Sequence, residues 1–213
     1  MRLVLFLLAT LSSFPLQAKP KWEPVSTEDG IEVYAMEVAG SDLIAFKGIK
    51  TMNQPIGKMA FVLLNLEVEA KKQWVDRMME FQVLELTDDH SVTYSSYNLP
   101  WPMNDRDFVI RSDFVLDKKE KTFTLFLKSV EHEKAPETVG VRGVVYKSRY
   151  ALKALSKDQT KVEVEIHSDP KGLLPKWLIN RIQRRWPYNT LSKMELQAAK
   201  PHVKSHKKVA PLL

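Results

Sequence analysis

The chain has 213 residues, no cysteine and a net charge of +6 at neutral pH. This length suits one domain with a sizeable core, and the lack of cysteine excludes disulfides, thiol catalysis and cysteine-ligated zinc. The positive charge is concentrated near the C-terminus, where residues 171–208 hold ten Lys or Arg and a single acid, Glu195. Such a charge distribution attracts a phosphate-bearing surface, either anionic lipid or nucleic acid.

The first 18 residues are typical of a secretory signal peptide, because Met1-Arg2 precedes the short apolar run "LVLFLLATLSSF". We expect cleavage near Ala18 and a periplasmic mature protein, with an uncleaved anchor as the alternative. Export makes lipid the more natural anionic partner. The expected organisation is a signal peptide at 1–18, one folded domain at 19–200 and a basic flexible tail at 201–213.

The first elements of the mature chain are predicted to be a hairpin and a short helix. Residues 31–37 and 43–51 have the composition of two strands, with turn signals at Gly30 and in "AGSD". The next segment opens with Pro55 and carries apolar residues at helical spacing through residue 64.

Beyond Trp74 the sequence predicts an antiparallel meander, since short polar connections such as "TDDH", "DKKEK" and "SKDQ" separate the apolar runs. The expected strands lie near 79–87, 91–99, 107–117, 122–130, 142–155 and 160–168. Strands followed by a C-terminal helix indicate an α+β fold.

Alternation along these strands separates an inner face from an outer one. In 106–116 the even positions are mostly apolar and the odd ones are mostly charged, and 144–152 and 161–168 follow the same rule. The inner face also carries polar groups, and strand 92–98 adds three if it keeps the same parity: Tyr94, Ser96, Asn98, Ser112, Tyr146, Ser148, Tyr150 and Ser168. Individually these groups can bond to the backbone at strand ends, but together they favour a cavity for a mostly apolar ligand.

The last element is predicted to be a long amphipathic helix beginning at Lys171-Gly172, with Trp177 and Trp186 on its apolar side. Pro187 should kink it. Residues 201–213 have no hydrophobic period and should form a mobile tail.

No catalytic or cofactor signature is present, because the chain lacks nucleophile elbows, phosphate-binding glycine loops and H-E-x-x-H. His202 and His206 have a metal-like spacing but no third ligand. We therefore expect no cofactor, no metal and no enzymatic activity. Trp177 and Trp186 are spaced for a core or a membrane edge rather than for stacking on bases, so we also expect no nucleic-acid partner.

Three motifs carry a family resemblance: "NLPWPMNDRDFV" at 98–109, "SVEHEKAPETVGVRG" at 129–143 and "GLLPKWLINRIQRRWPYNTL" at 172–191. Together with the order of elements, they resemble a START domain, the steroidogenic acute regulatory protein-related lipid-transfer domain, over residues 22–198. The resemblance implies a helix-grip fold, in which a curved antiparallel sheet wraps around a long C-terminal helix and encloses a tunnel for one lipid. Such domains bind sterols, phospholipids, ceramides or other hydrophobic molecules and usually catalyse nothing.

The expected ligand is thus a sterol, phospholipid, fatty acyl or quinone-like molecule, bound by a monomer that touches anionic membranes transiently. The expected ligand-binding residues are Tyr94, Ser96, Asn98, Phe108, Ile110, Ser112, Phe114, Leu125, Leu127, Tyr146, Ser148, Tyr150, Val164, Ile166, Trp177 and Leu178. The C-terminal helix is the expected gate, and membrane docking is assigned to Arg181, Arg184 and Arg185.

The turn before strand 107–117 has a structural role in this interpretation. Arg106 should tie it down through carboxylates or carbonyls, and Trp101 should cover its apolar underside. Two departures from the family pattern are visible: the N-terminal part is short, and Ser112 stands where several members have an arginine facing the ligand's polar head. The latter leaves specificity open.

Two other functions fit the same features. A helix-grip cyclase or hydratase could use the tyrosines and Asn98 on a polyketide-like substrate in the same tunnel. Alternatively, an envelope module could sense a hydrophobic ligand and signal to a partner protein.

Overall fold

The structure, a computed structural model, describes residues 21–101 and 103–212, so the expected signal peptide lies outside the described residues. The helices are α1 (Ile56–Leu64), α2 (Val68–Lys72), α3 (Lys176–Gln183), α4 (Trp186–Ala198) and the 3-10 helix η1 (Lys207–Leu212). The strands are β1 (Glu23–Glu28), β2 (Ile31–Met36), β3 (Ala45–Met52), β4 (Met78–Leu86), β5 (His90–Tyr97), β6 (Arg106–Asp117), β7 (Thr122–Ser129), β8 (Val141–Arg142), β9 (Val144–Ala154) and β10 (Thr160–Asp169). The α+β architecture predicted from the sequence is confirmed.

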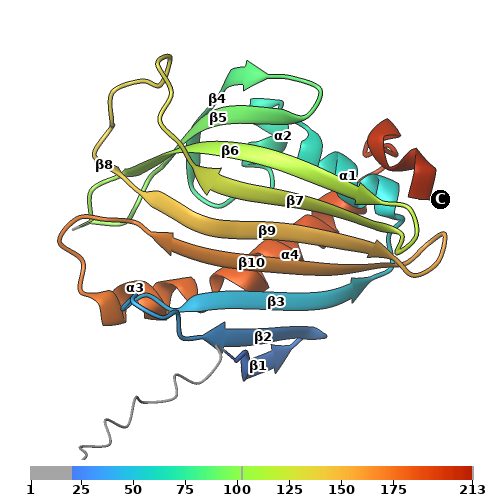
Figure 1. The fold of residues 1–213 in the computed structure, drawn as a ribbon, viewed down its shortest axis with the longest axis horizontal. Coiled ribbons are helices and arrows are strands. Elements are labelled where there is room, and N and C mark those ends of the chain that lie inside the picture. The colour runs from blue at the N-terminus through green and yellow to red at the C-terminus, as the bar shows by residue number, and fades with distance from the viewer. Residues whose placement is uncertain (1–20, 102, 213) are drawn as a thin grey trace, which may run out of the picture.

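One curved sheet runs in the order β1-β2-β3-β10-β9-β7-β6-β5-β4, and α4 crosses one face of it (Figure 1). All pairs in this path are antiparallel, whereas the two-residue β8 adds a parallel bridge to β6. The predicted meander is therefore confirmed, and the first and last parts of the chain meet where β3 pairs with β10.

The elements not predicted from the sequence include β1 and the short helix α2. The β1–β2 hairpin turns at Asp29 and Gly30, which both have positive φ (51° and 72°), the geometry favoured in two-residue hairpins. Most of β1 is exposed, so no alternation of apolar and polar residues marks it as a strand.

The predicted long C-terminal helix is divided in two. The break falls at Arg184 and Arg185, and Pro187 lies in the first turn of α4, where its missing N–H costs nothing. At its N-terminal end α4 packs directly on β3, because Gly48 presents no side chain there. A Cβ atom at this position would lie 2.7 Å from the Cβ of Pro187 and 2.9 Å from Leu191.

The segment after α4 corrects the prediction of a mobile tail at 201–213. Val203, Val209 and Leu212 are buried in the same apolar core as α1 and α4. The sequence of this segment, "PHVKSHKKVAPLL", has no hydrophobic period, which is why the segment resembles a mobile tail in the sequence. Burial of these side chains fixes the segment against the domain.

Candidate functional site

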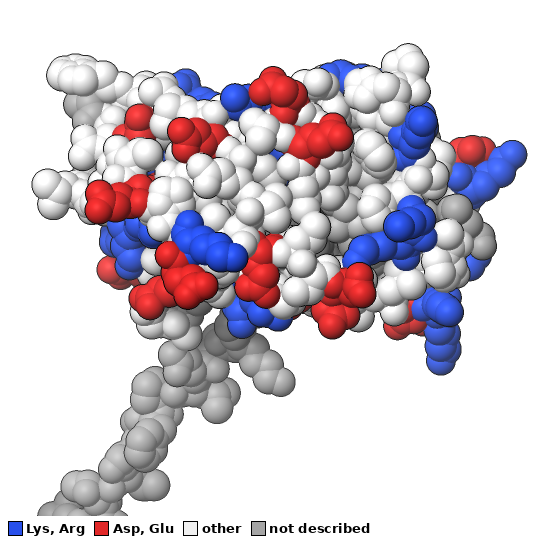
Figure 2. Space-filling view, turned by 90° about the horizontal axis from the view of Figure 1, so that it is seen from above, with Lys and Arg blue, Asp and Glu red and all other residues white. Residues whose placement is uncertain are grey.

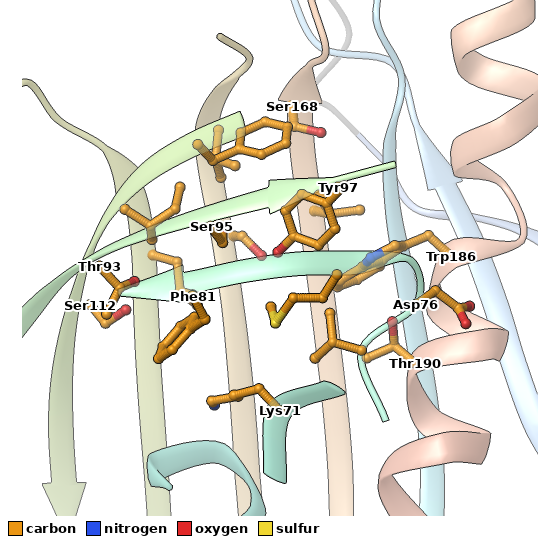
Figure 3. A pocket seen from close by; sticks show the side chains of 18 of the residues that line it. Lys71, Asp76, Phe81, Thr93, Ser95, Tyr97, Ser112, Ser168, Trp186 and Thr190 are labelled. Atoms are coloured by element: carbon orange, nitrogen blue, oxygen red, sulfur yellow. The ribbon is translucent and has the colours of Figure 1, made fainter. Parts of the chain in front are cut away.

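A large cavity lies between the concave face of the sheet and the helices, with a volume of about 830 Å³ (Figure 3). This volume falls toward the upper end of the roughly 300–1,000 Å³ typical of small-molecule sites. Nine of the residues predicted to bind ligand line it: Phe108, Ile110, Ser112, Phe114, Leu125, Leu127, Ser148, Tyr150 and Ile166. They come from β6, β7, β9 and β10, so the assignment of faces was right for the middle of the sheet.

The prediction was wrong for β5, where the odd residues rather than the even ones face the cavity. Thr93 pairs with Ile110 and Ser95 with Phe108, so the ladder joins odd positions to even ones. Thr93, Ser95 and Tyr97 therefore line the cavity, while Tyr94, Ser96 and Asn98 do not. Parity cannot be carried from one strand to the next, because the length of the connecting turn decides it.

Tyr94 and Ser96 instead lie on the opposite face of the sheet, fully buried. Tyr94 forms a small second core there with Leu84, Val92 and Val109, covered by the segment around Val130 and Ala135. Asn98 is exposed, and its side-chain amide donates to Asp105 (3.3 Å). These three residues have no contact with the cavity.

Tyr146 also lies outside, because a β-bulge changes the parity of β9. His167 pairs with Lys147, but Ser168 pairs with Val145, which leaves Tyr146 as the extra residue. Val145 consequently faces the cavity, whereas Tyr146 is 46% exposed and packs on His167 with ring centroids 5.1 Å apart.

Val164, Trp177 and Leu178 complete the corrections to the predicted site. Val164 faces inward but lies beside Gly48 in the ladder, where α4 covers it, so it belongs to the core. On α3, Ile179, Ile182 and Gln183 line the cavity in place of Trp177 and Leu178. Trp177 is 65% exposed.

Hydroxyl groups form one polar part of the cavity wall. The side chains of Ser95 and Tyr97 point toward one another in Figure 3. Burial raises the pKa of Tyr97, with an opposing effect from the Ser95 hydroxyl. Burial likewise raises the pKa of Tyr150, and proximity to Tyr97 adds to it. Both phenols therefore stay neutral at ordinary pH and can donate to, or accept from, a ligand.

A second polar part lies where α3 meets the end of β10. The Gln183 amide nitrogen donates to the backbone oxygen and the hydroxyl of Ser168, at 3.1 and 3.0 Å. Its amide oxygen is buried and has no partner among the described residues. A buried acceptor without a partner is costly, so this oxygen can accept a hydrogen bond from a ligand hydroxyl or amide.

Among the lysines and arginines of the described residues, only Lys71 has a pKa that is lowered by burial to a value near neutrality. It was not among the site residues predicted from the sequence. Its ammonium lines the cavity near Phe81 (Figure 3) and donates to the Leu63 carbonyl at 2.8 Å. The rings of Trp74 and Phe81 lie 5.5 and 5.8 Å from it, and no carboxylate in the part of the chain that the structure describes pairs with it. Burial lowers the pKa of Lys71 from 10.5 to about 8. Lys72 beside it points outward, and nothing in "EAKKQW" distinguishes the two.

Arg106 lies at one end of the cavity and is saturated with backbone acceptors, as expected. It donates to the carbonyls of Pro170 (2.6 Å) and Lys171 (3.2 Å) and to those of Asn104 and Asp105. The guanidinium therefore holds the β5–β6 loop against the β10–α3 loop. Trp101 does not cover the underside of this turn as predicted, because it is 92% exposed.

Comparison with known proteins identifies the family. The START domain profile matches residues 7–199 of this chain. The chain belongs to the START domain family. An uncharacterized protein of Pseudomonas aeruginosa is 28% identical over 84% of this chain and 87% of its own length, and the phosphatidylcholine transfer protein of Bos taurus is 27% identical over 84% and 85%. The STAR-related lipid transfer protein fragment of Xanthomonas axonopodis has the same fold, with a TM-score of 0.74, 24% identity and coverage of 84% and 99%.

As a START domain the chain has the helix-grip fold that the resemblance implied, with α4 as the helix enclosed by the sheet. Several of its named relatives are lipid-transfer proteins. Among residues 21–101 and 103–212, no group of acidic or histidine side chains could hold a metal ion. No helix in those same ranges is long and apolar enough to cross a membrane.

The arginines assigned to docking lie on the outer side of this START domain, and their surroundings differ. Arg181 is exposed. Arg184 donates weakly to the Val25 carbonyl (3.4 Å), and Arg185 forms an ion pair with Glu28 at 2.8 Å. Basic and acidic side chains are interspersed over the face seen in Figure 2, so that face has no extended area of one sign.

Proposed function

We propose that this START domain carries one lipid in its cavity between membranes, and that the lipid has an anionic group, such as a phosphate, that contacts Lys71. The buried ammonium of Lys71 carries this proposal. A cation enclosed by aromatic rings and one carbonyl lacks the counter-charge that buried charges in proteins normally have. The phosphatidylcholine transfer proteins among the relatives support a phospholipid as the ligand.

The remaining wall suits the rest of such a molecule. Aromatic and aliphatic side chains of β6, β7 and β10 surround most of the space, so acyl chains can lie along them. Burying several hundred Å² of apolar surface at about 25 cal/mol per Å² contributes on the order of ten kcal/mol before ordering costs. Release into water is therefore slow, and exchange requires contact with a membrane.

The end of the molecule at α3 is the proposed site of that contact. Leu173 is fully exposed on the β10–α3 loop, Trp177 projects from α3, and Trp101 projects from the β5–β6 loop that Arg106 holds beside it. Exposed apolar residues next to Arg181 suit insertion into an anionic interface. Because Leu99 and Met103 on the same loop line the cavity, tilting of α3 there would open a path for the lipid.

Other parts of the proposal rest on the sequence. The protein acts as a monomer in the periplasm after cleavage near Ala18, and it catalyses no reaction. Intact-mass measurement of the exported protein tests the cleavage site, because retention of residues 1–18 would contradict it.

Ligand identity is tested by native mass spectrometry of protein purified from its own host, followed by organic extraction. A phospholipid should be released. Lys71→Met should lower the affinity for phosphatidylcholine by at least about tenfold, equivalent to about 1.4 kcal/mol. The matched control Lys72→Met should leave it unchanged. The proposal fails if no hydrophobic molecule co-purifies and phospholipids, fatty acids and sterols all fail to bind.

Docking is tested with charge reversals at the α3 end. Arg181→Glu, and more strongly the combined reversal of Arg181, Arg184 and Arg185, should reduce binding to anionic liposomes but leave uptake of detergent-presented ligand intact. Lys157→Glu, on the exposed β9–β10 turn, is the matched charge control. Unchanged liposome binding by the triple variant would remove the docking role.

A further inference from the structure

The segment 201–212, called the C-terminal strap below, lies beyond the region matched by the family profile yet forms part of the cavity wall. The profile ends at residue 199. His206 and Lys208, both in the strap, line the cavity. Figure 1 shows the strap, in red, beside α1 and away from α3. The strap is therefore an addition to the shared domain, located at the opposite end from the proposed membrane contact.

The strap is fastened to the first turn of α1 by a close fit around Gly57. The His206 amide donates to the Gly57 carbonyl at 3.0 Å. Ser205 occupies the space that a side chain at position 57 would need, because a Cβ there would lie 1.7 Å from the Ser205 hydroxyl oxygen and 2.8 Å from its Cβ. Any larger residue at position 57 must displace the strap.

A second attachment crosses to the sheet. The Lys208 ammonium donates to the Asp88 carbonyl in the β4–β5 turn at 2.7 Å. It also lies 4.0 Å above the ring of Phe114, a cavity-lining residue of β6. The strap thus spans from α1 on the helical side to β4–β5 on the sheet side, and contributes His206 and Lys208 to the cavity wall at this end.

The contacts of the Lys208 side chain indicate that it forms part of the cavity wall and does not bind a charged group of the ligand. Its ammonium is already bound to a carbonyl and a ring face, and long basic side chains commonly cover apolar surface with their methylene groups. The part of Lys208 that a ligand would meet is therefore its aliphatic stem.

We propose that the C-terminal strap is the end wall that sets the longest acyl chain the cavity accepts. This inference rests on the proposed lipid binding. Each added methylene group that enters an apolar cavity raises affinity by about fourfold. That gain in affinity must stop where the acyl chain meets His206 and Lys208. The strap therefore makes the cavity selective for acyl chains below a certain length.

The test compares chain-length profiles of four proteins: the intact chain, Gly57→Ala, Ser205→Gly and the double variant. Binding is measured by native mass spectrometry with two homologous series, saturated phosphatidylcholines and free fatty acids, each of stepwise increasing length. For the intact chain, affinity should rise and then fall sharply beyond one length. Gly57→Ala should raise affinity for the chains just beyond that limit by at least about tenfold. The double variant, which removes the hydroxyl and Cβ that collide, should return toward the intact profile.

Two further variants test the end wall by changes other than substitution of Gly57 or Ser205. Lys208→Ala shortens the wall while Val203, Val209 and Leu212 stay buried, and it should also shift the limit to longer chains. Truncation after Lys200 should shift it furthest, with circular dichroism to verify folding.

The outcomes separate the two proposals. If the intact chain and all variants bind lipids with one common limit, or if the intact chain shows no limit, the strap is not the end wall, although the proposed function stands. If no protein in the set binds either series, the end-wall proposal is overturned, and the co-purification and sterol-binding tests then decide the proposed function.

Discussion

Arg106 and Lys71 are both buried cations at the cavity, and they differ in how completely the protein satisfies them. Arg106 donates to four backbone carbonyls drawn from two loops. Lys71 donates to one carbonyl and otherwise faces aromatic rings. A saturated cation holds structure together, whereas an unsaturated one retains the capacity to bind something else.

The largest effect should follow removal of Arg106. Arg106→Met leaves several loop carbonyls without a donor and should lower the free energy of unfolding by about 4 kcal/mol. Urea denaturation measures this change. Arg111→Met is the matched control, because Arg111 points outward and pairs with Asp113 at 2.8 Å, so its loss should change the free energy of unfolding far less. Equal effects from both variants would show that Arg106 is not a clamp.

The pH dependence of the free energy of unfolding should show that Lys71, unlike Arg106, is a buried cation without enough hydrogen-bond acceptors. The pKa of Lys71 is about 8 in the folded chain, below its ordinary value of 10.5, so unfolding takes up a proton between these values. The ligand-free protein should therefore gain about 3 kcal/mol in free energy of unfolding as pH rises through this window. Because other groups titrate there too, the relevant quantity is the difference between the intact chain and Lys71→Met. Parallel pH curves for the two would contradict the assignment.

Ligand affinity should show the opposite dependence on pH. An anionic headgroup stabilises protonated Lys71, so affinity for phosphatidylcholine should be highest below pH 8 and should fall as the ammonium loses its proton. A decrease of about tenfold between pH 7.5 and 9.5 is expected from titration of one such group. Fluorescence titration with a labelled phospholipid measures it. In Lys71→Met this dependence should vanish.

The smallest effect should come from the tyrosines. Tyr150→Phe removes a buried hydroxyl that lines the cavity and should change ligand affinity by about threefold, within the usual range for one neutral hydrogen bond. Tyr146→Phe alters a residue outside the cavity and should leave affinity unchanged. Equilibrium binding of a labelled phospholipid to the two variants measures this difference. Equal affinities would contradict the assignment of Tyr150 to the cavity and of Tyr146 to the outer face.

The sequence predicted the meander, the α+β class and the inner faces of β6, β7 and β10, because alternation within one strand is a direct record of burial. It could not predict the register between strands. Tyr94 was assigned to the cavity because the turn before β6 was assumed to preserve parity, and Tyr146 because a one-residue bulge leaves no signature in composition.

The missing site residues share a different cause. Lys71 lies two residues after Glu69 and precedes Lys72 in a polar stretch that resembles a solvated helix. The packing of Trp74 and Phe81 against it is not visible in that stretch. Gln183 lies among arginines, so its contact with Ser168 depends on how α3 is rotated. The periodicity of a short stretch of sequence cannot predict that a side chain is buried by segments far away in the chain.

The contact at Gly48 limits where this molecule can change shape. β3 and the start of α4 meet closely there, and a side chain at position 48 would collide with Pro187 and Leu191. We therefore expect changes in cavity width to come from other parts of the wall, such as α3 before Arg185 and the segment after Ala198. In our two proposals, α3 admits the lipid and the C-terminal strap limits its length, while the contact between β3 and α4 stays fixed.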